Sequence, residues 1–145
     1  MRVLEYKVVT VDNNLTLNLH DGGGHRRIMR GKIEVVVESD TEVRNIAILV
    51  VDAGPLTGKS VAWIGGGFCV GPRICAIAEC HQTVYEIEPA LAEFCPPGVT
   101  FVPGDWRDTL TGKYDVIFYD LGGDVPRGIL SQHLNRSGTI LPKEN

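Results

Sequence analysis

A glycine-rich turn and an acidic residue downstream of it have the types and spacing that could bind a nucleotide. The stretch VAWIGGGFCVGPR begins as an apolar run at Val61 and meets three consecutive glycines, Gly65, Gly66 and Gly67. A glycine turn between a strand and a helix lets a ligand approach the backbone closely and points the first helical amides at it. Glu86 follows 21 positions after Gly65, near the end of the next expected strand, where a carboxylate can accept both hydrogen bonds of a ribose diol. The pair predicts a nucleoside site.

Two further acids stand at expected strand ends. Asp105 follows the third strand in PGDW, and Asp120 follows the fourth in YDVIFYDLGGD. The carboxyl ends of parallel strands open onto one crevice, so we expect both acids to meet the glycine turn there. The structural alternative is that Asp105 caps a turn and Asp120 begins a loop. Asp120 and Asp124 form a candidate pair of carboxylates that could steer a cationic amine and accept its proton.

The first forty residues have the pattern of a small antiparallel β unit. Residues 4–11 and the stretch LTLNLH alternate apolar and polar side chains on either side of a turn signal at residues 12–14. This arrangement predicts a β-hairpin. IMRGKIEVVVE adds one or two β segments that are broken at Gly31.

A helix and then an alternation of strands and helices follow. Ser39 and Glu42 form a capping box before apolar residues at helical spacing, so we expect a helix at 41–53, with a strand as the alternative because β-branched residues are frequent there. Further along, we expect strands at 60–64, 83–87, 99–102, 114–119 and 138–141, and helices at 72–80, 89–94 and 126–135. Alternating strands and helices imply right-handed crossovers and a parallel sheet.

The expected fold is therefore α/β. We expect a Rossmann-like body at residues 41–145, with a shortened parallel sheet of about five strands. A small N-terminal antiparallel β unit at residues 1–40 joins it, and the length of 145 residues suits one compact domain overall.

Composition argues against several classes of partner. The net charge of −4 and the isoelectric point near 5.5 are unlike those of a general nucleic-acid binder, and the basic cluster of residues 25–27 with Arg30 and Lys32 is typical of a solvated hairpin or turn. The sequence has no apolar run of about 18 residues that could span a bilayer, and no signal-peptide core follows Met1. We expect a cytoplasmic protein with neither nucleic acid nor membrane as a partner.

Cysteine and histidine spacing does not predict a metal site. The four cysteines, at positions 69, 75, 80 and 95, form no C-x-x-C pair, so free buried thiols are expected rather than a metal or disulfide site. His20 and His25 flank an acid in HDGGGH but lack a third ligand at a recognised spacing. We interpret that segment as a glycine-rich turn.

The motifs VAWIGGGFCVGPR, VYEIEP, GDW and YDVIFYDLGGD occur here in an order and spacing that resemble those of class I S-adenosylmethionine-dependent methyltransferase folds. They most resemble the spermidine synthase (polyamine aminopropyltransferase) branch. LTLNLHDG is similar to that family's strand ending in leucine, aspartate and glycine, and the helix at 41–53 stands where its tyrosine-histidine-glutamate helix precedes the glycine loop. The resemblance covers almost the whole chain.

The resemblance implies S-adenosylmethionine or its decarboxylated form as the cofactor. It places the adenosyl group over the loop of Gly65, Gly66 and Gly67, with Glu86 on the ribose hydroxyls. It implies that Asp105 reads the adenine amino group, with Trp106 beside it in the same cofactor site. The catalytic positions that it implies are Asp120, as the general base for the attacking amine, and Asp124.

Three departures from the family pattern concern the amine side of the site. Phe68, Cys69 and Val70 stand where the family has aspartate, glycine and glycine, and that aspartate helps hold the aminopropyl donor. The tyrosine-histidine pair appears here as residues 44–45, Arg-Asn. The sequence ends just after the fifth expected strand, whereas the family continues with a helix and an antiparallel pair.

Two classes of function therefore remain open, with a third as a weaker alternative. The first is an adenosyl-nucleoside-binding protein that could act as a group transferase on an unidentified small acceptor. The second is an inactive Rossmann scaffold or interaction module whose exposed sheet edge is covered by a second copy, so that we expect a homodimer. A nicotinamide-dependent oxidoreductase is less well supported, because the glycines do not follow G-x-G-x-x-G and no second mononucleotide-binding half follows.

Overall fold

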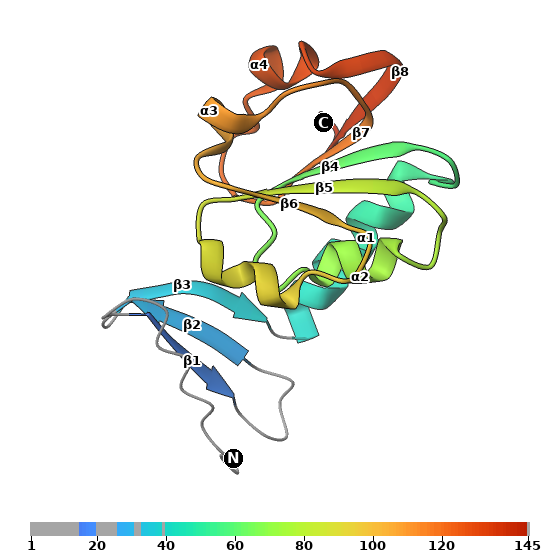
Figure 1. The fold of residues 1–145 in the computed structure, drawn as a ribbon. Coiled ribbons are helices and arrows are strands. Elements are labelled where there is room, and N and C mark those ends of the chain that lie inside the picture. Colours follow the sequence, from blue (N-terminus) through green and yellow to red (C-terminus); the bar gives the residue numbers. More distant parts are fainter. Residues whose placement is uncertain (1–14, 20–25, 31–32, 39, 145) are drawn as a thin grey trace. The chain divides into compact units, whose positions relative to one another are not determined.

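The computed structural model describes residues 15–19, 26–30, 33–38 and 40–144 (Figure 1). The chain divides into two compact units, residues 1–46 and 47–145. The division falls within helix α1 (Asp40–Ala53). The domain boundary expected at residue 40 stays a prediction.

The first unit contains a three-stranded antiparallel sheet in the order β1-β2-β3. Its strands are β1 (Leu15–Leu19), β2 (Arg26–Arg30) and β3 (Ile33–Glu38). The two β segments expected on either side of residue 31 are thus separate strands, and their pairing contains an irregularity between Ile28 and Met29. The strand expected at residues 4–11 lies outside the described residues.

Helix α1 matches the helix expected at 41–53, so the helical spacing of its apolar residues outweighed its β-branched content. None of the described helices combines the length and apolar character that a membrane crossing requires.

The second unit contains a five-stranded sheet in the order β6-β5-β4-β7-β8, in which every neighbouring pair is parallel. The strands are β4 (Ser60–Ile64), β5 (His81–Glu86), β6 (Thr100–Pro103), β7 (Tyr114–Tyr119) and β8 (Leu134–Leu141). From β4 the chain adds strands outward on one side, and it then returns to add β7 and β8 on the other (Figure 1). The strand order therefore reverses between β4 and β7, which is where open α/β sheets bind ligands.

Four short helical segments connect these strands. They are α2 (Val70–Cys75), the 3-10 helix η1 (Pro89–Phe94), α3 (Trp106–Thr109) and α4 (Arg127–Ser131). The sequence did not predict α3. The helix expected at 72–80 is wrong at both ends, because Pro72 is accommodated in the first turn and the chain must leave α2 early to enter β5 at His81.

The helix expected at 126–135 is also too long, because α4 ends at Ser131 and residues 134–135 belong to β8, which begins four residues before the strand expected at 138–141. A tertiary contact explains the early start of that strand: Asn135 Nδ2 donates to Asp115 Oδ1 at 3.0 Å. Asp115 Oδ2 accepts from the backbone N–H of Ser60 at 2.9 Å, so one carboxylate joins β4, β7 and β8. These two donors hold the pKa of Asp115 below its ordinary value.

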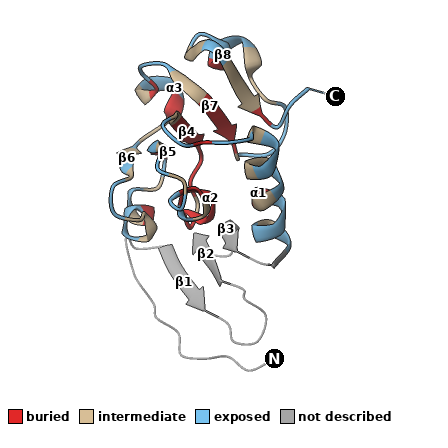
Figure 2. Cartoon of the chain, turned by 90° about the vertical axis from the view of Figure 1, so that its right-hand side faces the viewer, coloured by how far each residue is buried: buried red, intermediate tan, exposed pale blue. Residues whose placement is uncertain are grey.

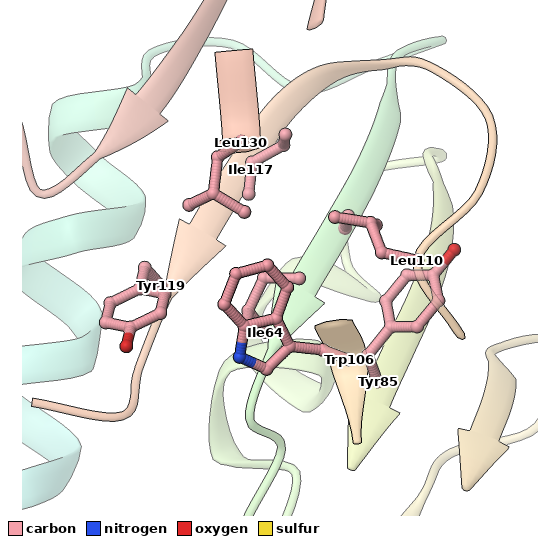
Figure 3. Packing of buried hydrophobic residues seen from close by; sticks show 8 residues of the cluster. Ile64, Tyr85, Trp106, Leu110, Ile117, Tyr119 and Leu130 are labelled. Carbon is pink, nitrogen blue, oxygen red and sulfur yellow. The ribbon is translucent and has the colours of Figure 1, made fainter. Parts of the chain in front are cut away.

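The core lies on both faces of the sheet, and buried residues run along β4 and β7 (Figure 2). On one face, residues from β4, β5 and β7 pack with α3 and α4; the cluster comprises Ala62, Ile64, Tyr85, Trp106, Leu110, Ile117, Tyr119 and Leu130 (Figure 3). Because side chains alternate along a strand, Trp63 and Phe118 point to the other face. Two covered faces explain the nearly continuous apolar runs of β4 and β7.

Trp63 organises the second face. Its ring stacks on Phe118, with centroids 4.1 Å apart and planes at 13°, and its Nε1 donates to Gln82 Oε1 at 2.9 Å. Gln82 Nε2 in turn donates to the carbonyl oxygen of Pro72 at 3.0 Å, which ties β5 to α2. A Cβ atom on Gly71 would come within 2.1 Å of the Trp63 ring. Gly71 is therefore required for the packing of α2 against β4.

We predict that Gly71→Ala destabilises the protein by about 1–3 kcal/mol, because the new methyl group collides with a rigid buried ring. Gly128→Ala is the matched control, since Gly128 is also helical and a Cβ there would meet nothing within 4 Å. That change should leave stability unchanged or raise it by up to about 1 kcal/mol. Urea unfolding measures both, and equal effects of the two substitutions would contradict the packing role of Gly71.

Candidate functional site

The glycine turn begins where β4 ends. Gly65 has φ of +85° and Gly67 has φ of +51°, in the left-handed region that glycine adopts readily. The N–H of Gly65 donates to the carbonyl oxygen of Tyr85 at 2.9 Å, which continues the contact between β4 and β5 into the turn. The turn then leads directly into α2, as the sequence predicted.

Glu86, at the end of β5, holds the turn in place. Its side chain is buried, at 7% exposure, and its Oε1 accepts from the N–H groups of Gly66 at 3.2 Å and Gly67 at 3.1 Å. Its Oε2 accepts from the N–H of Glu88 at 2.9 Å. A carboxylate offers about four acceptor positions, so three backbone donors occupy most of them. Glu86 therefore has a structural role that its spacing from Gly65 did not reveal.

A pocket of about 110 Å³ opens at the carboxyl ends of the strands. It is lined by Gly65, Tyr85, Glu86, Ile87, Gly104, Asp105, Trp106, Arg107 and Leu121. These residues follow or end strands β4, β5, β6 and β7, so the crevice spans the point where the strand order reverses. The structure thus brings Gly65, Glu86, Asp105 and Trp106 together, while Gly66 and Gly67 join the site through their bonds to Glu86.

Asp105 also caps helix α3. Capping a turn was the structural role that the sequence analysis gave as the alternative to ligand binding. Its Oδ1 accepts from the N–H of Arg107 at 2.9 Å and lies 3.6 Å from Arg107 Nη1. The guanidinium of Arg107 lies 4.9 Å from the centroid of the Trp106 ring. Asp105 is therefore held at the mouth of the pocket in a fixed orientation.

Trp106 forms part of the pocket wall and of the core at once. Its indole is 4% exposed and meets Tyr119 edge to face, with centroids 6.3 Å apart (Figure 3). Its Nε1–H is buried and has no hydrogen-bond partner among the described residues. Buried polar groups normally have a partner, so this donor is an exception within the wall of the pocket.

Neither candidate catalytic acid is among the described residues that line the pocket at the glycine turn. Asp120 is half-buried directly after β7, and its N–H donates to the carbonyl oxygen of Ile64 at 2.9 Å, which places it next to the glycine turn. Asp124 is exposed and borders a second, open hollow formed with Arg127 and the segment 142–144. Gly122 and Gly123, with φ of +72° and +68°, turn the chain between the two acids. The sequence left open whether the two acids, four residues apart in a glycine-rich loop, face each other.

The residues after the glycines are part of the core. Phe68 is 2% exposed and packs edge-on against Phe94, with ring centroids 4.9 Å apart. Cys69 and Val70 are buried as well, so none of these three side chains replaces an acid in the pocket. The sequence did not predict this inward orientation, although the apolar character of the three residues is a signal that could have indicated it.

The four cysteines are free thiols, and the Sγ atoms of Cys69 and Cys95 lie 3.3 Å apart. Burial raises the pKa of all four thiols, that of Cys75 to about 12. Across the described part of the chain, no group of three or more His, Cys, Asp or Glu side chains could hold a metal ion.

Solved structures of methyltransferases share this architecture. A SAM-dependent methyltransferase from Thiobacillus denitrificans, in complex with S-adenosyl-L-homocysteine, matches with a TM-score of 0.56 and 20% identity over 67% of this chain and 46% of its own. Protein-L-isoaspartate O-methyltransferase matches with a TM-score of 0.62 and 19% identity, over 89% of this chain and 41% of its own. This chain has the Rossmann-like class I methyltransferase fold. The fold prediction, including its five-stranded parallel sheet, is confirmed.

A third structure of the same kind, the C-terminal domain of precorrin-6Y C5,15-methyltransferase from Rhodobacter capsulatus, has a TM-score of 0.56 and 17% identity, over 67% of this chain and 59% of its own. This chain thus spans less than two thirds of the length of each of these three structures. No protein-family model matches the sequence, and no curated protein sequence matches it.

We predict that Glu86→Ala lowers the free energy of unfolding by about 1–3 kcal/mol, because three backbone N–H groups lose their acceptor. Glu93→Ala removes an equal charge from an exposed position of η1 and should change stability by no more than about 0.5 kcal/mol. Urea unfolding compares the two variants. A Glu86 variant as stable as the wild type would show that these bonds do not hold the turn.

Proposed function

We propose that the protein binds S-adenosylmethionine or a related adenosyl nucleoside in the pocket beside the glycine turn, and transfers a group from it to a small acceptor. One observation carries the proposal: the glycine turn, Glu86, Asp105 and Trp106 meet in one pocket where the strand order reverses. The likeness to methyltransferase structures, one of them holding S-adenosyl-L-homocysteine, supports it.

In this proposal the ligand lies along the carboxyl ends of the strands. Asp105 accepts a hydrogen bond from the adenine amino group, and Trp106 forms part of the wall beside it. Glu86 has room for about one more hydrogen bond beside its three backbone donors, and we assign that position to one of the two ribose hydroxyls. The glycine turn lies beneath the adenosyl group.

The bound cofactor would supply the activated group, and the chain would supply positioning and a base. Asp120 stands after β7, next to the glycine turn, and is our candidate for accepting the proton of the acceptor. Asp124 borders the neighbouring open hollow with Arg127 and Lys143, and it could attract a cationic acceptor there. Both assignments rest on the sequence motif and on position.

The finer proposal is that the protein belongs to the spermidine synthase-like branch and uses decarboxylated S-adenosylmethionine. The order and spacing of its motifs support this branch. The buried Phe68 offers no counter-charge to an aminopropyl amine, which favours a methyl-donor or nucleoside ligand instead. Binding measurements with both forms of the cofactor distinguish these alternatives.

We predict that calorimetric titration with S-adenosylmethionine, its decarboxylated form or methylthioadenosine at millimolar concentration gives a saturable signal with at least one of them. Glu86→Ala should weaken that binding at least about tenfold, because it removes a ligand contact and releases the turn. Glu93→Ala is the control for charge and should bind as the wild type does. The absence of binding to all three ligands would contradict the proposed function.

A scaffold that acts through self-association is the alternative class of function. Within the described sheet, β8 has a single neighbour, β7, so its other edge presents backbone groups that a second copy could pair with. We propose a homodimer on this basis.

A cytoplasmic location, and the lack of nucleic-acid and membrane partners, remain expectations from composition.

For this interface we predict a concentration-dependent dimer in analytical ultracentrifugation. Arg136→Pro, at an exposed position of β8, should weaken the dimer, because proline removes an N–H and interrupts strand pairing. Pro is also disruptive within the chain, so circular dichroism must first show that the variant stays folded. A strict monomer of the wild-type chain at high concentration would rule out the pairing.

A further inference from the structure

Leu121 lies directly over Gly65 inside the pocket. A Cβ atom built on Gly65 would come within 2.5 Å of Leu121 Cδ2 and 3.1 Å of its Cγ. The space that a bare glycine leaves open for a ligand is therefore filled by a leucine side chain from the loop after β7. Both residues line the pocket.

The pocket extends across four neighbouring strands of the sheet, from β6 at one end to β7 at the other. Asp105 and Trp106 follow β6, whereas Leu121 follows β7, and β5 and β4 lie between them. At a strand spacing of about 4.8 Å, the pocket spans roughly 14 Å of the sheet edge. A nucleoside whose base lies at Asp105 and whose ribose lies at Glu86 therefore directs its C5′ substituent toward Gly65 and Leu121.

The pocket is small, and Gly65 and Leu121 line its β7 end. The pocket measures about 110 Å³, whereas pockets that enclose a drug-sized ligand measure about 300–1,000 Å³. Among the described residues that line the pocket, the cation Arg107 lies at the β6 end, beside Asp105 and Trp106. The carboxylate of an amino-acid substituent would find no cation among the described residues that line the Leu121 end, and the Leu121 side chain over Gly65 leaves little room for the longer chain.

We propose that Leu121 determines which adenosyl ligands the site accepts, by favouring a nucleoside with a short uncharged C5′ substituent over one with a charged amino-acid chain. This inference rests on the proposed adenosyl-binding function and specifies its ligand class. The ligand with the longer chain binds only when Leu121 moves away from Gly65.

Leu121 is able to move. Its side chain is 51% exposed, so one side of it has no packing neighbours to hold it. Gly122 and Gly123 follow it with positive φ values, so the loop has little side-chain bulk to restrain it. The obstruction is therefore a modest one, and we expect it to change affinity by about three- to tenfold, the effect of forcing one side chain into an unfavourable rotamer.

Calorimetric titration with methylthioadenosine and S-adenosylhomocysteine tests the inference, because the two ligands share the base and ribose and differ in the C5′ chain. We expect the wild-type chain to bind methylthioadenosine about three- to tenfold more tightly. Leu121→Ala should remove this difference by strengthening S-adenosylhomocysteine binding, and it should leave methylthioadenosine binding within about twofold. Leu121→Phe should increase the difference.

Ile129→Ala is the matched control, since Ile129 is 49% exposed and does not line the pocket. It should change neither affinity. Both ligands could bind while Leu121→Ala leaves the ratio of their affinities unchanged or weakens both equally. That result would contradict the proposed role of Leu121 in ligand selectivity, but not the proposed adenosyl-binding function. If neither ligand binds to the wild-type chain, the inference is wrong, whereas the proposed function is wrong only if S-adenosylmethionine and its decarboxylated form fail to bind as well.

Discussion

The carboxylate of Glu86 determines the geometry of the candidate site, because it accepts hydrogen bonds from the glycine turn after β4 and from the chain after β5. A turn of three glycines has high conformational entropy when it is free, and ordering it is costly. Charge-assisted hydrogen bonds to a buried acceptor offset that cost, since they are stronger than neutral ones. The same bonds limit what Glu86 can offer to a ligand, because most of its acceptor positions are already used. The pocket is thus built on a residue that both shapes the turn and contributes to the wall.

The stretch from Val61 to Arg73 contains residues with two different roles. Gly65 lines the pocket, and its bare Cα faces the side chain of Leu121. Gly71 lacks a side chain for a different reason, because the ring of Trp63 occupies the space that a Cβ would need. Phe68, Cys69 and Val70 are buried and attach the start of α2 to the core. Glycines that look alike in the sequence therefore differ in role according to what packs against them.

The acids at the strand ends show how position in the sheet decides the chemistry that they can do. Asp105 is fixed by the helix that it caps and by Arg107, so its carboxylate has a defined orientation at the mouth of the pocket. Asp124 is carried away from the pocket by the two glycines before it, into a hollow that also contains cationic side chains. Asp120 stays beside the turn because its N–H is bonded to Ile64. A role in proton transfer is therefore easier to assign to Asp120 than to the pair.

The sequence alone was sufficient to predict the α/β class, the positions of β4 and β7, and the meeting of Gly65, Glu86 and Asp105 at one edge of the sheet. These features depend on hydrophobic periodicity and on the rule that parallel strands end at one edge, both of which are local or topological. The sequence did not predict where α2 and α4 end, that β8 begins at Leu134, or that Leu121 covers Gly65. Those features depend on contacts between residues far apart in the chain, such as Asn135 with Asp115 and Leu121 with Gly65. Only the tertiary structure brings such pairs together, because no local propensity or spacing encodes which distant side chain will fill a given space.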